Sequence, residues 1–417
     1  MAGVVFRNAQ LIDATRNEAR EGFDVLVEGS RIKEVSDKPI KVAGEGIREL
    51  DINGKTLMPG LIDAHVHVKA SELDIAKLMT KPVSYLFAET AQIMQAMLMR
   101  GFTTVRDAAG ADRGLADAVD DGLLVGPRLR VCGLALSQTG GHSDNRPVTM
   151  MSQAGQVLQQ HNLMQQLGRI ADGVDECRRA ARDELRKGAH HVKIMAGGGV
   201  ASPSDPIENT QYSSEELVAI CEEAAAWQTY TMAHTYTPAS IAMAVRAGVR
   251  TVEHCNLIDK ETAELVAEMG AYHVPTNITY HALNKHGREF GLPQVSIDKL
   301  KAIVDAGLGA LELTSNAGVK IGYGTDLLGA CHRYQSNEFS LSAEVLGNFG
   351  AIKTSLQTAA EIMYLDDQVG RIETGYMADL IVVDGNPLVN IGCLENDGQN
   401  IPLVMKEGRI FKNLLNA

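Results

Sequence analysis

The sequence lacks the marks of a disulfide-stapled or membrane-spanning protein. Its six cysteines are widely scattered and form no CxxC pair, which is typical of free thiols in a reducing compartment. No uninterrupted apolar run reaches the length needed to cross a bilayer. The first residues also lack the charged and apolar regions of a signal peptide. We therefore expect a cytoplasmic protein with no membrane partner.

Positive charge is scarce as well. The chain has 39 Lys and Arg against 52 Asp and Glu, a net charge of −13, and no basic stripe. This balance argues against nucleic acid as a partner. Hydrophobic residues at 45% and charged residues at 22% fit a globular protein. A length of 417 residues suits a large domain with a smaller one attached.

Both ends of the chain have the pattern of short strands and turns. Residues 1–58 include a hairpin-like stretch at 25–35, and residues 379–417 include apolar runs at 380–383 and 404–411. A Glu-Gly pair stands at the turn of each hairpin, where the conformational freedom of glycine is needed. Neither end has enough apolar surface for a core of its own. We predict that both ends combine into one small β-sandwich domain.

Residues 59–378 alternate between short β-rich runs and helical patterns, the second illustrated by 215–224 after a Ser213-Ser214 cap. The first apolar run ends at His67. The other seven lie at 103–107, 129–133, 191–196, 230–234, 251–254, 273–276 and 321–325. Eight strand–helix units over this length predict an α/β fold, a (β/α)₈ TIM barrel. In such a barrel, chemistry is found at the C-terminal ends of the strands.

Potential metal ligands stand at five of these strand ends. His65 and His67 close the first strand, and because side chains at i and i+2 share a face, both imidazoles point the same way. Converging imidazoles favour a zinc-class metal. The other candidates are Lys193 in the fourth strand, His234 ending the fifth, His254 ending the sixth and Asp326 ending the eighth. Each has an ordinary structural explanation alone, but a barrel would gather all six.

These residues carry a family resemblance. The segment 59–67, ending in His65-Val66-His67, and Gly324-Thr325-Asp326 resemble the signatures of the amidohydrolase superfamily. Within it, the chain is similar to the imidazolonepropionase-like group, which includes metal-dependent prolidases and dipeptidases. Imidazolonepropionase itself has no lysine at the fourth strand, so Lys193 favours a two-metal dipeptidase-like site.

The resemblance implies two divalent metal ions, zinc by expectation. His65, His67 and Asp326 would hold one ion, His234 and His254 the other, and a carboxylated Lys193 would bridge them. Asp326 would act as general base towards a metal-activated water. No GxSxG nucleophile motif is present.

Two further side chains are candidates for substrate binding and catalysis. His142 follows paired glycines in the loop after the third strand and is a candidate for binding a substrate carboxylate or carbonyl. Tyr236, two residues after His234, is a candidate oxyanion donor. A surface histidine and a packed tyrosine are the ordinary alternatives. His281 and His332 are weaker candidates, and we interpret His161, His190 and His286 as structural or solvated.

The implied activity is hydrolysis of a small dipeptide, with Xaa-Pro as the leading choice. A basic C-terminal residue such as Arg or Lys, an N-acyl amino acid or a cyclic amide would fit the same centre. A scaffold protein on the same fold is disfavoured because the ligand set is complete. We expect a homo-oligomer whose partner is a small-molecule substrate.

Overall fold

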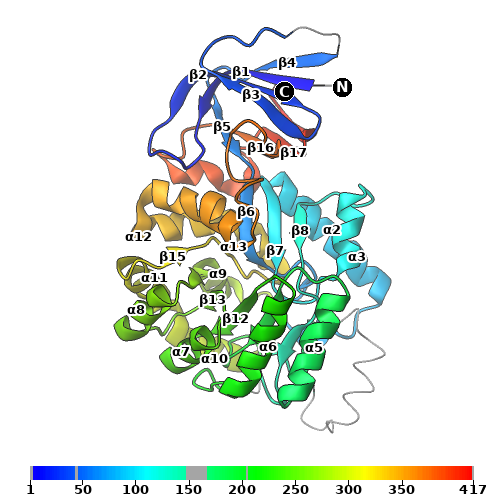
Figure 1. Cartoon of the computed structure of the whole chain (residues 1–417), viewed down its shortest axis with the longest axis vertical. Helices are drawn as coiled ribbons and strands as arrows, with labels where there is room; N and C mark the ends of the chain where they lie inside the picture. Colours follow the sequence, from blue (N-terminus) through cyan, green and yellow to red (C-terminus); the bar gives the residue numbers. More distant parts are fainter. Residues whose placement is uncertain (1–2, 43–45, 147–166, 203–204, 416–417) are drawn as a thin grey trace.

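The computed structural model describes residues 3–42, 46–146, 167–202 and 205–415. Figure 1 shows a β-rich part that holds both ends of the chain and, beside it, a larger part in which strands and helices alternate. Among the described residues, no helix is long and apolar enough to cross a bilayer. All six cysteines are buried and free, as predicted.

The larger part is built on parallel strands. Three of them pair in the order β6 (Leu61–Val66), β7 (Phe102–Asp107) and β8 (Arg128–Arg130). The other sheet has the order β10 (Gly168–Ile170), β9 (Ala135–Ser137), β11 (Val192–Met195), β12 (Thr231–Thr235), β13 (Thr251–His254), β14 (Tyr272–Val274) and β15 (Lys320–Ile321). The backbone N–H groups of Ala64 and Asp326 join the first and eighth strands through the carbonyls of Tyr323 and His65, at 2.8 Å each. Apart from the unpredicted β10, which pairs with β9 at the edge of its sheet, the strands follow the order expected of the predicted barrel.

Two predicted strands differ from the observed ones. The strand expected at 129–133 is split into β8 and β9, because Gly133 adopts a φ of 69° and gives its N–H to the carbonyl of Ala111. The strand expected at 321–325 is regular only over Lys320–Ile321. Beyond it, residues 322–326 continue as an irregular extended segment. That segment carries Asp326 back towards His65.

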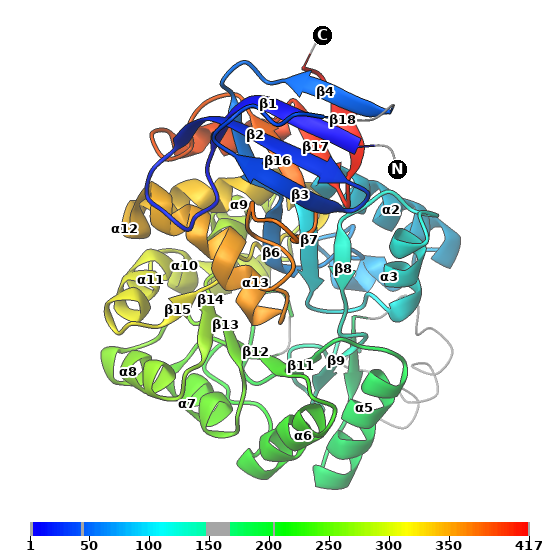
Figure 2. The ribbon, with the colours of Figure 1, turned by 45° about the horizontal axis from the view of Figure 1, so that its top comes forward.

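Helices surround these strands (Figure 2). They are α1 (Ile75–Leu78), α2 (Val83–Met99), α3 (Arg113–Asp120), α5 (Val174–Arg186), α6 (Ser214–Ala226), α7 (Pro238–Arg246), α8 (Lys260–Glu268), α9 (Asn277–His286), α10 (Gln294–Val304), α11 (Gly307–Asn316), α12 (Glu338–Lys353) and α13 (Ala359–Ile362). The predicted cap of α6 is present, since Ser213 and Glu216 form a reciprocal capping box. Shorter helical turns lie at Gly329–Asn337, Thr354–Thr358, Ile391–Leu394 and Asn396–Gly398.

Strands from both ends of the chain share one eight-stranded sheet. Its order is β18 (Arg409–Asn413), β17 (Leu403–Lys406), β16 (Leu380–Val383), β5 (Thr56–Pro59), β1 (Gly3–Leu11), β2 (Arg20–Glu28) and β3 (Arg31–Ser36), with β4 (Ile47–Asp51) beside β1. The ends meet where β16 runs antiparallel to β5. Gly29 and Gly408 have positive φ at the two hairpin turns. These turns abut so closely that a Cβ on Gly408 would lie 1.9 Å from the carbonyl oxygen of Gly29.

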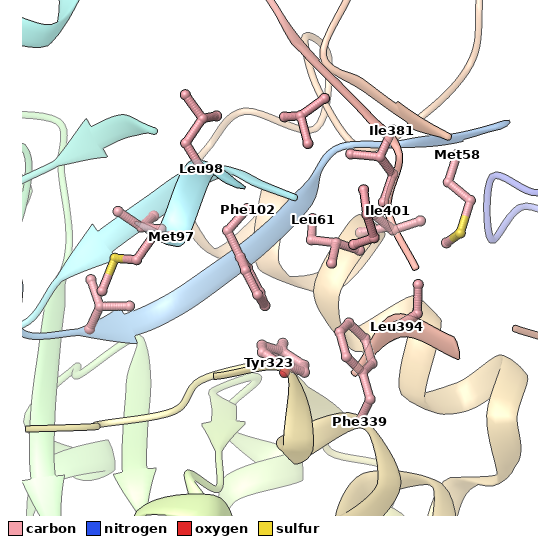
Figure 3. Packing of buried hydrophobic residues seen from close by; sticks show 14 of the residues in the cluster. Met58, Leu61, Met97, Leu98, Phe102, Tyr323, Phe339, Ile381, Leu394 and Ile401 are labelled. Atoms are coloured by element: carbon pink, nitrogen blue, oxygen red, sulfur yellow. The ribbon is translucent and has the colours of Figure 1, made fainter. Parts of the chain in front are cut away.

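A hydrophobic cluster joins this sheet to the barrel part (Figure 3). Ile381 of β16 and Ile401 pack in the same cluster as Leu61 of β6 and Phe102 of β7, and each is fully buried. The two parts therefore share a core. The division of the chain into a β-sandwich domain of 1–58 and 379–417 and a barrel domain of 59–378 stays a prediction.

Candidate metal centre and substrate pocket

All six predicted metal ligands line one pocket. They come from the ends of five strands: β6 carries His65 and leads into His67, β11 carries Lys193, β12 and β13 carry His234 and His254, and Asp326 follows β15. The strand ends thus bring together residues that are far apart in the sequence.

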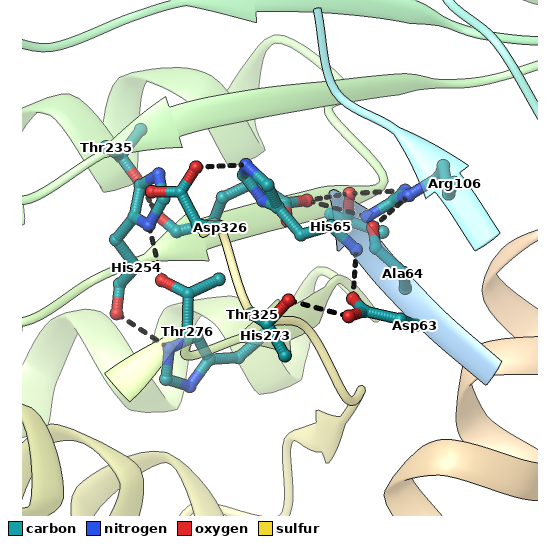
Figure 4. Close-up of polar contacts among 12 residues, drawn as sticks. Asp63, Ala64, His65, Arg106, Thr235, His254, His273, Thr276, Thr325 and Asp326 are labelled. Atoms are coloured by element: carbon teal, nitrogen blue, oxygen red, sulfur yellow. Dashed lines mark hydrogen bonds and ion pairs between the residues drawn. The ribbon is translucent and has the colours of Figure 1, made fainter. Parts of the chain in front are cut away.

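Asp326 lies between the two histidines of the first strand. Its Oδ1 is 3.3 Å from His65 Nε2 and 2.8 Å from His67 Nε2. The candidate ligand atoms of His65, His254 and Asp326 all lie within 4.8 Å of one another. Figure 4 shows these side chains converging from separate strands. Burial acts to raise the pKa of Asp326, but the neighbouring His65 and His67 outweigh it and hold that pKa well below its usual range.

Hydrogen bonds around the centre fix which imidazole nitrogen carries a proton. His65 Nδ1 lies 2.7 Å from Glu253 Oε2, so its proton sits on Nδ1 and its Nε2 is left with a lone pair. His234 Nε2 is 3.0 Å from the carbonyl of Gly198, which leaves the lone pair of the neutral ring on Nδ1. Carbonyls and carboxylates only accept hydrogen bonds, so both assignments follow from the partners.

The donor set fits a divalent metal. His65 Nε2 and His67 Nδ1 are buried and have no hydrogen-bond partner, a state that is uncommon for buried polar atoms. Burial lowers the pKa of His234 and of His254 well below the ordinary value. Neutral imidazoles beside an ionised carboxylate are the ligands that zinc-class metals prefer. We therefore regard this cluster as a possible His/Asp metal site.

The backbone turns sharply where three of these side chains leave their strands. His254, Thr276 and Asp326 have φ values of 72°, 52° and 50°, in the left-handed region. Thr276 Oγ1 lies 2.7 Å from His254 Nδ1. Non-glycine residues are uncommon in this region, and His254, Thr276 and Asp326 are among those of this chain that adopt it.

Lys193 is buried at the floor of the pocket. Burial lowers the pKa of its amine, opposed by the charges of Glu253 and Asp326. A lowered amine pKa increases the fraction of neutral amine, which is the form that reacts with carbon dioxide. The position and environment of Lys193 thus fit the predicted carboxylation, which itself stays a prediction.

His142 lies against the candidate ligands. Its ring stacks on that of His234, with centroids 4.2 Å apart, and it lines the pocket. Its Nδ1 is 2.9 Å from Ser202 Oγ. The ordinary alternative, a solvated loop histidine, does not describe this placement. Its substrate-binding role is untested.

Tyr236 is also close to the centre, but its hydroxyl has another partner. Its ring lies 4.9 Å from that of His234 and 5.5 Å from that of His254. Its hydroxyl forms a 2.9 Å hydrogen bond with Tyr280. Burial raises the pKa of Tyr236 above its usual value, so the hydroxyl stays protonated and able to donate.

Within the described residues, the other histidines named from the sequence are absent from the pocket lining, and three of them have structural partners. His332 Nε2 lies 3.0 Å from the carbonyl of Ala70, His190 Nδ1 accepts from the backbone of Val131 and His286 contacts Tyr334. His281 is half-buried, and His161 lies outside the described residues.

Sequence reasoning missed the charged pair below the centre. Arg106 is fully buried, and its guanidinium donates to Glu253 Oε1 at 3.0 Å and to the carbonyl of Ala64 at 2.6 Å. Two signals were present: Arg106 inside the predicted strand 103–107, and Glu253 directly before His254. Both signals indicated charged side chains in buried strands. Buried charged side chains are almost always paired.

Comparison with known proteins shows similarity to several hydrolases. The model of the amidohydrolase family matches residues 56–411. Ochratoxinase from Aspergillus niger is 34% identical over 405 residues, covering 91% of this chain and 82% of that protein. A crystal structure of an amidohydrolase is 50% identical with a TM-score of 0.94, covering 99% of both chains. A prolidase solved with N-methylphosphonate-L-proline is 46% identical with a TM-score of 0.96, covering 99% of this chain and 100% of that one.

Proposed function

This chain belongs to the amidohydrolase family, and on that premise we propose that it is a two-metal hydrolase of small amides, with Xaa-Pro dipeptides as substrates. The observation that carries the proposal is the convergence of six potential ligands on one pocket. The similarity to a prolidase and to ochratoxinase supports amide hydrolysis.

In this proposal His65, His67 and Asp326 hold one divalent ion, and His234 and His254 hold the other. A carboxylated Lys193 would add an anionic ligand to this set. Zinc is the expected metal, on the basis of the imidazole and carboxylate donors. Two such ions, when bound, lower the pKa of water and polarise a carbonyl.

The chain's own residues supply proton transfer and orientation. The low pKa of Asp326 keeps it ionised at neutral pH, so it can accept a proton from the attacking water and give it to the leaving amine. The protonated Tyr236 hydroxyl is suited to donate to the developing oxyanion if it releases Tyr280. His142 is assigned to the substrate carboxylate.

The lining of the pocket favours an uncharged substrate side chain. Apolar residues form much of the wall: Ile75, Ala109, Leu167, Met195, Ala201 and Leu328. Among the described lining residues, the only carboxylate is Asp326, which the metal site uses. A dipeptide ending in Arg or Lys would therefore bury its charge without a partner. Proline adds apolar surface and no charge.

A substrate panel tests this proposal directly. Metal-replete enzyme is offered Xaa-Pro dipeptides with apolar Xaa, dipeptides ending in Arg or Lys, N-acyl amino acids and cyclic amides such as hydantoins and imidazolonepropionate. We expect the highest kcat/KM for the apolar Xaa-Pro group. Rapid opening of a cyclic amide without dipeptide cleavage would instead assign a cyclic-amide hydrolase.

Ligand variants provide the control for that panel. His67→Ala and Asp326→Asn are expected to abolish turnover while circular dichroism shows a retained fold. His281→Ala, a half-buried histidine outside the pocket lining, is expected to keep wild-type activity. Turnover by a chelated, metal-free wild type would contradict a metal-dependent mechanism.

A further inference from the structure

Asp205 is a buried carboxylate close to His142 for which the mechanism above has no role. It is 1% exposed and belongs to the loop that follows β11. His142 belongs to a different loop, the one that follows β9. Asp205 Oδ2 lies 3.4 Å from His142 Nδ1. The two loops therefore meet at this carboxylate on the wall of the pocket.

Gln211 completes the connection between the two loops. Its side-chain amide donates to Asp205 Oδ2 at 3.0 Å, and its Oε1 accepts the backbone N–H of His142 at 2.8 Å. Asp205 Oδ2 also accepts the backbone N–H of Gly199 at 3.0 Å. Asp205 Oδ2 thus lies beside the ring of His142. It is also connected to the backbone of His142 through the side chain of Gln211.

The loop after β11 is fixed from the outside by Lys299 of α10. Its ammonium donates to the carbonyls of Gly199, Ser202 and Asp205, at 2.9, 2.7 and 2.5 Å. It also lies 3.8 Å from Asp205 Oδ1, an atom with no hydrogen-bond partner. The cation therefore compensates the buried carboxylate and holds the loop backbone at three points.

The fit between this loop and His142 leaves no spare room. A Cβ on Gly199 would lie 1.9 Å from His142 Cε1, so the backbone of Gly199 passes directly against the imidazole. The same ring stacks on that of His234. Because Gly199 and His234 both contact the ring, a shift of the loop would disturb the position of His142.

We propose that Asp205, with Lys299, is a positioning residue for substrate binding that sets the location of His142 in the pocket. The inference rests on the proposed function, because the expected effect is on the binding of a carboxylate-bearing amide substrate. Asp205 does not touch the predicted metal ligands in any described contact. Its removal should therefore affect substrate binding more than turnover or metal content.

The test compares Asp205→Asn with Glu208→Gln, a matched removal of one charge at an exposed site three residues away. Both are measured as metal-loaded enzymes on an Xaa-Pro dipeptide. We expect Asp205→Asn to raise KM by about tenfold. The neutral side chain weakens the charge-assisted hydrogen bond from Gln211, and the loss of one such bond has an effect of this size. Its kcat and its metal content should stay near wild type. Lys299→Met should act in the same direction, and Lys301→Met, on an exposed residue of the same helix, should not.

Hydrogen exchange measured over residues 138–146 gives a readout that does not need catalysis. Asp205→Asn should exchange faster there than wild type and Glu208→Gln, because the His142 amide loses its ordered acceptor. Equal exchange and unchanged KM would overturn the proposal. Loss of metal together with kcat would also overturn it, by assigning Asp205 to the metal centre. If wild type cleaves no dipeptide, the proposed function fails, and the exchange comparison alone decides whether Asp205 positions His142.

Discussion

At the scale of single residues, Glu253 links the candidate metal centre to the interior of the barrel. One of its oxygens accepts from His65 and the other accepts from Arg106. Burial opposes ionisation of this carboxyl, but Arg106 and His65 outweigh it and hold the pKa of Glu253 below its usual value. Glu253 is therefore ionised at neutral pH, and this carboxylate holds the proton of His65 on Nδ1.

We predict that Glu253→Gln lowers metal affinity by about 10- to 100-fold, the usual effect of losing an outer hydrogen-bond partner of a metal-binding histidine. Chelator competition on the folded protein measures this. Glu223→Gln is the control, since Glu223 pairs with Arg178 and Arg182 on the outer helices. Equal metal affinity in the two variants would show that Glu253 does not orient His65.

The residue types of the centre were predictable, but their partners were not. The paired histidines and the Gly324-Thr325-Asp326 signature identified three of the six residues that line one pocket, and the positions of Lys193, His234 and His254 at predicted strand ends identified the others. Glu253, Asp205 and Thr276 were missed because their roles depend on contacts between segments distant in sequence. The left-handed conformations of His254 and Asp326 likewise arise from how the strands end in three dimensions.

At the scale of elements, α12 begins with a buried acid. Glu338 accepts the backbone N–H of Ile278 at 2.6 Å and lies 3.3 Å from Ser342 Oγ. Burial raises the pKa of Glu338 from 4.5 to about 8. Within the described part of the chain no cation contacts Glu338, so its neutral form is favoured in the folded protein.

This raised pKa predicts a pH-dependent stability. Between about pH 4.5 and 8 the folded protein retains a proton that the unfolded chain has released, so the free energy of unfolding falls as pH rises, by up to roughly 1.4 kcal/mol per pH unit. Glu338→Gln should reduce this slope in urea unfolding, whereas Glu344→Gln, an exposed change in the same helix, should not. Part of the slope should remain because burial also raises the pKa of Asp63, to about 6. Identical slopes in both variants would contradict the assignment.

Most elements were predictable from their patterns, and the exceptions have local causes. The cap of α6 and the glycine turns of the two hairpins match the sequence signals. The third strand was misplaced because Gly133 interrupts it, and periodicity alone does not show where a strand bends. The eighth strand was overextended because residues 322–326 bond to the first strand irregularly.

At the scale of the whole molecule, the terminal sheet and the barrel part share the cluster shown in Figure 3. Ile381 of β16 is fully buried in that cluster, and a Cβ on Gly101 would lie 3.4 Å from its side chain. A shared core predicts that the two parts unfold together. Sequence patterns located both parts but gave no information on how they pack.

We predict that Ile381→Ala lowers the free energy of unfolding by about 2–5 kcal/mol in a single cooperative transition, with metal content unchanged. Val389→Ala, at a side chain that is 79% exposed, should change stability by less than about 0.5 kcal/mol. Chemical unfolding followed by circular dichroism and by tryptophan fluorescence measures both. Two separate transitions, with only one shifted, would indicate that the sheet is an independent domain.

The central claim is that this chain works with two metal ions linked through Lys193. The most direct measurement is the ratio of metal to protein in fully active enzyme, determined by elemental analysis, with carbon-13 NMR after incubation in labelled bicarbonate. The account predicts two metals per chain and a carbamate signal that is absent from Lys193→Ala, which should regain part of its activity with a short-chain carboxylic acid. One metal per active chain, with no carbamate signal, would contradict the two-metal site.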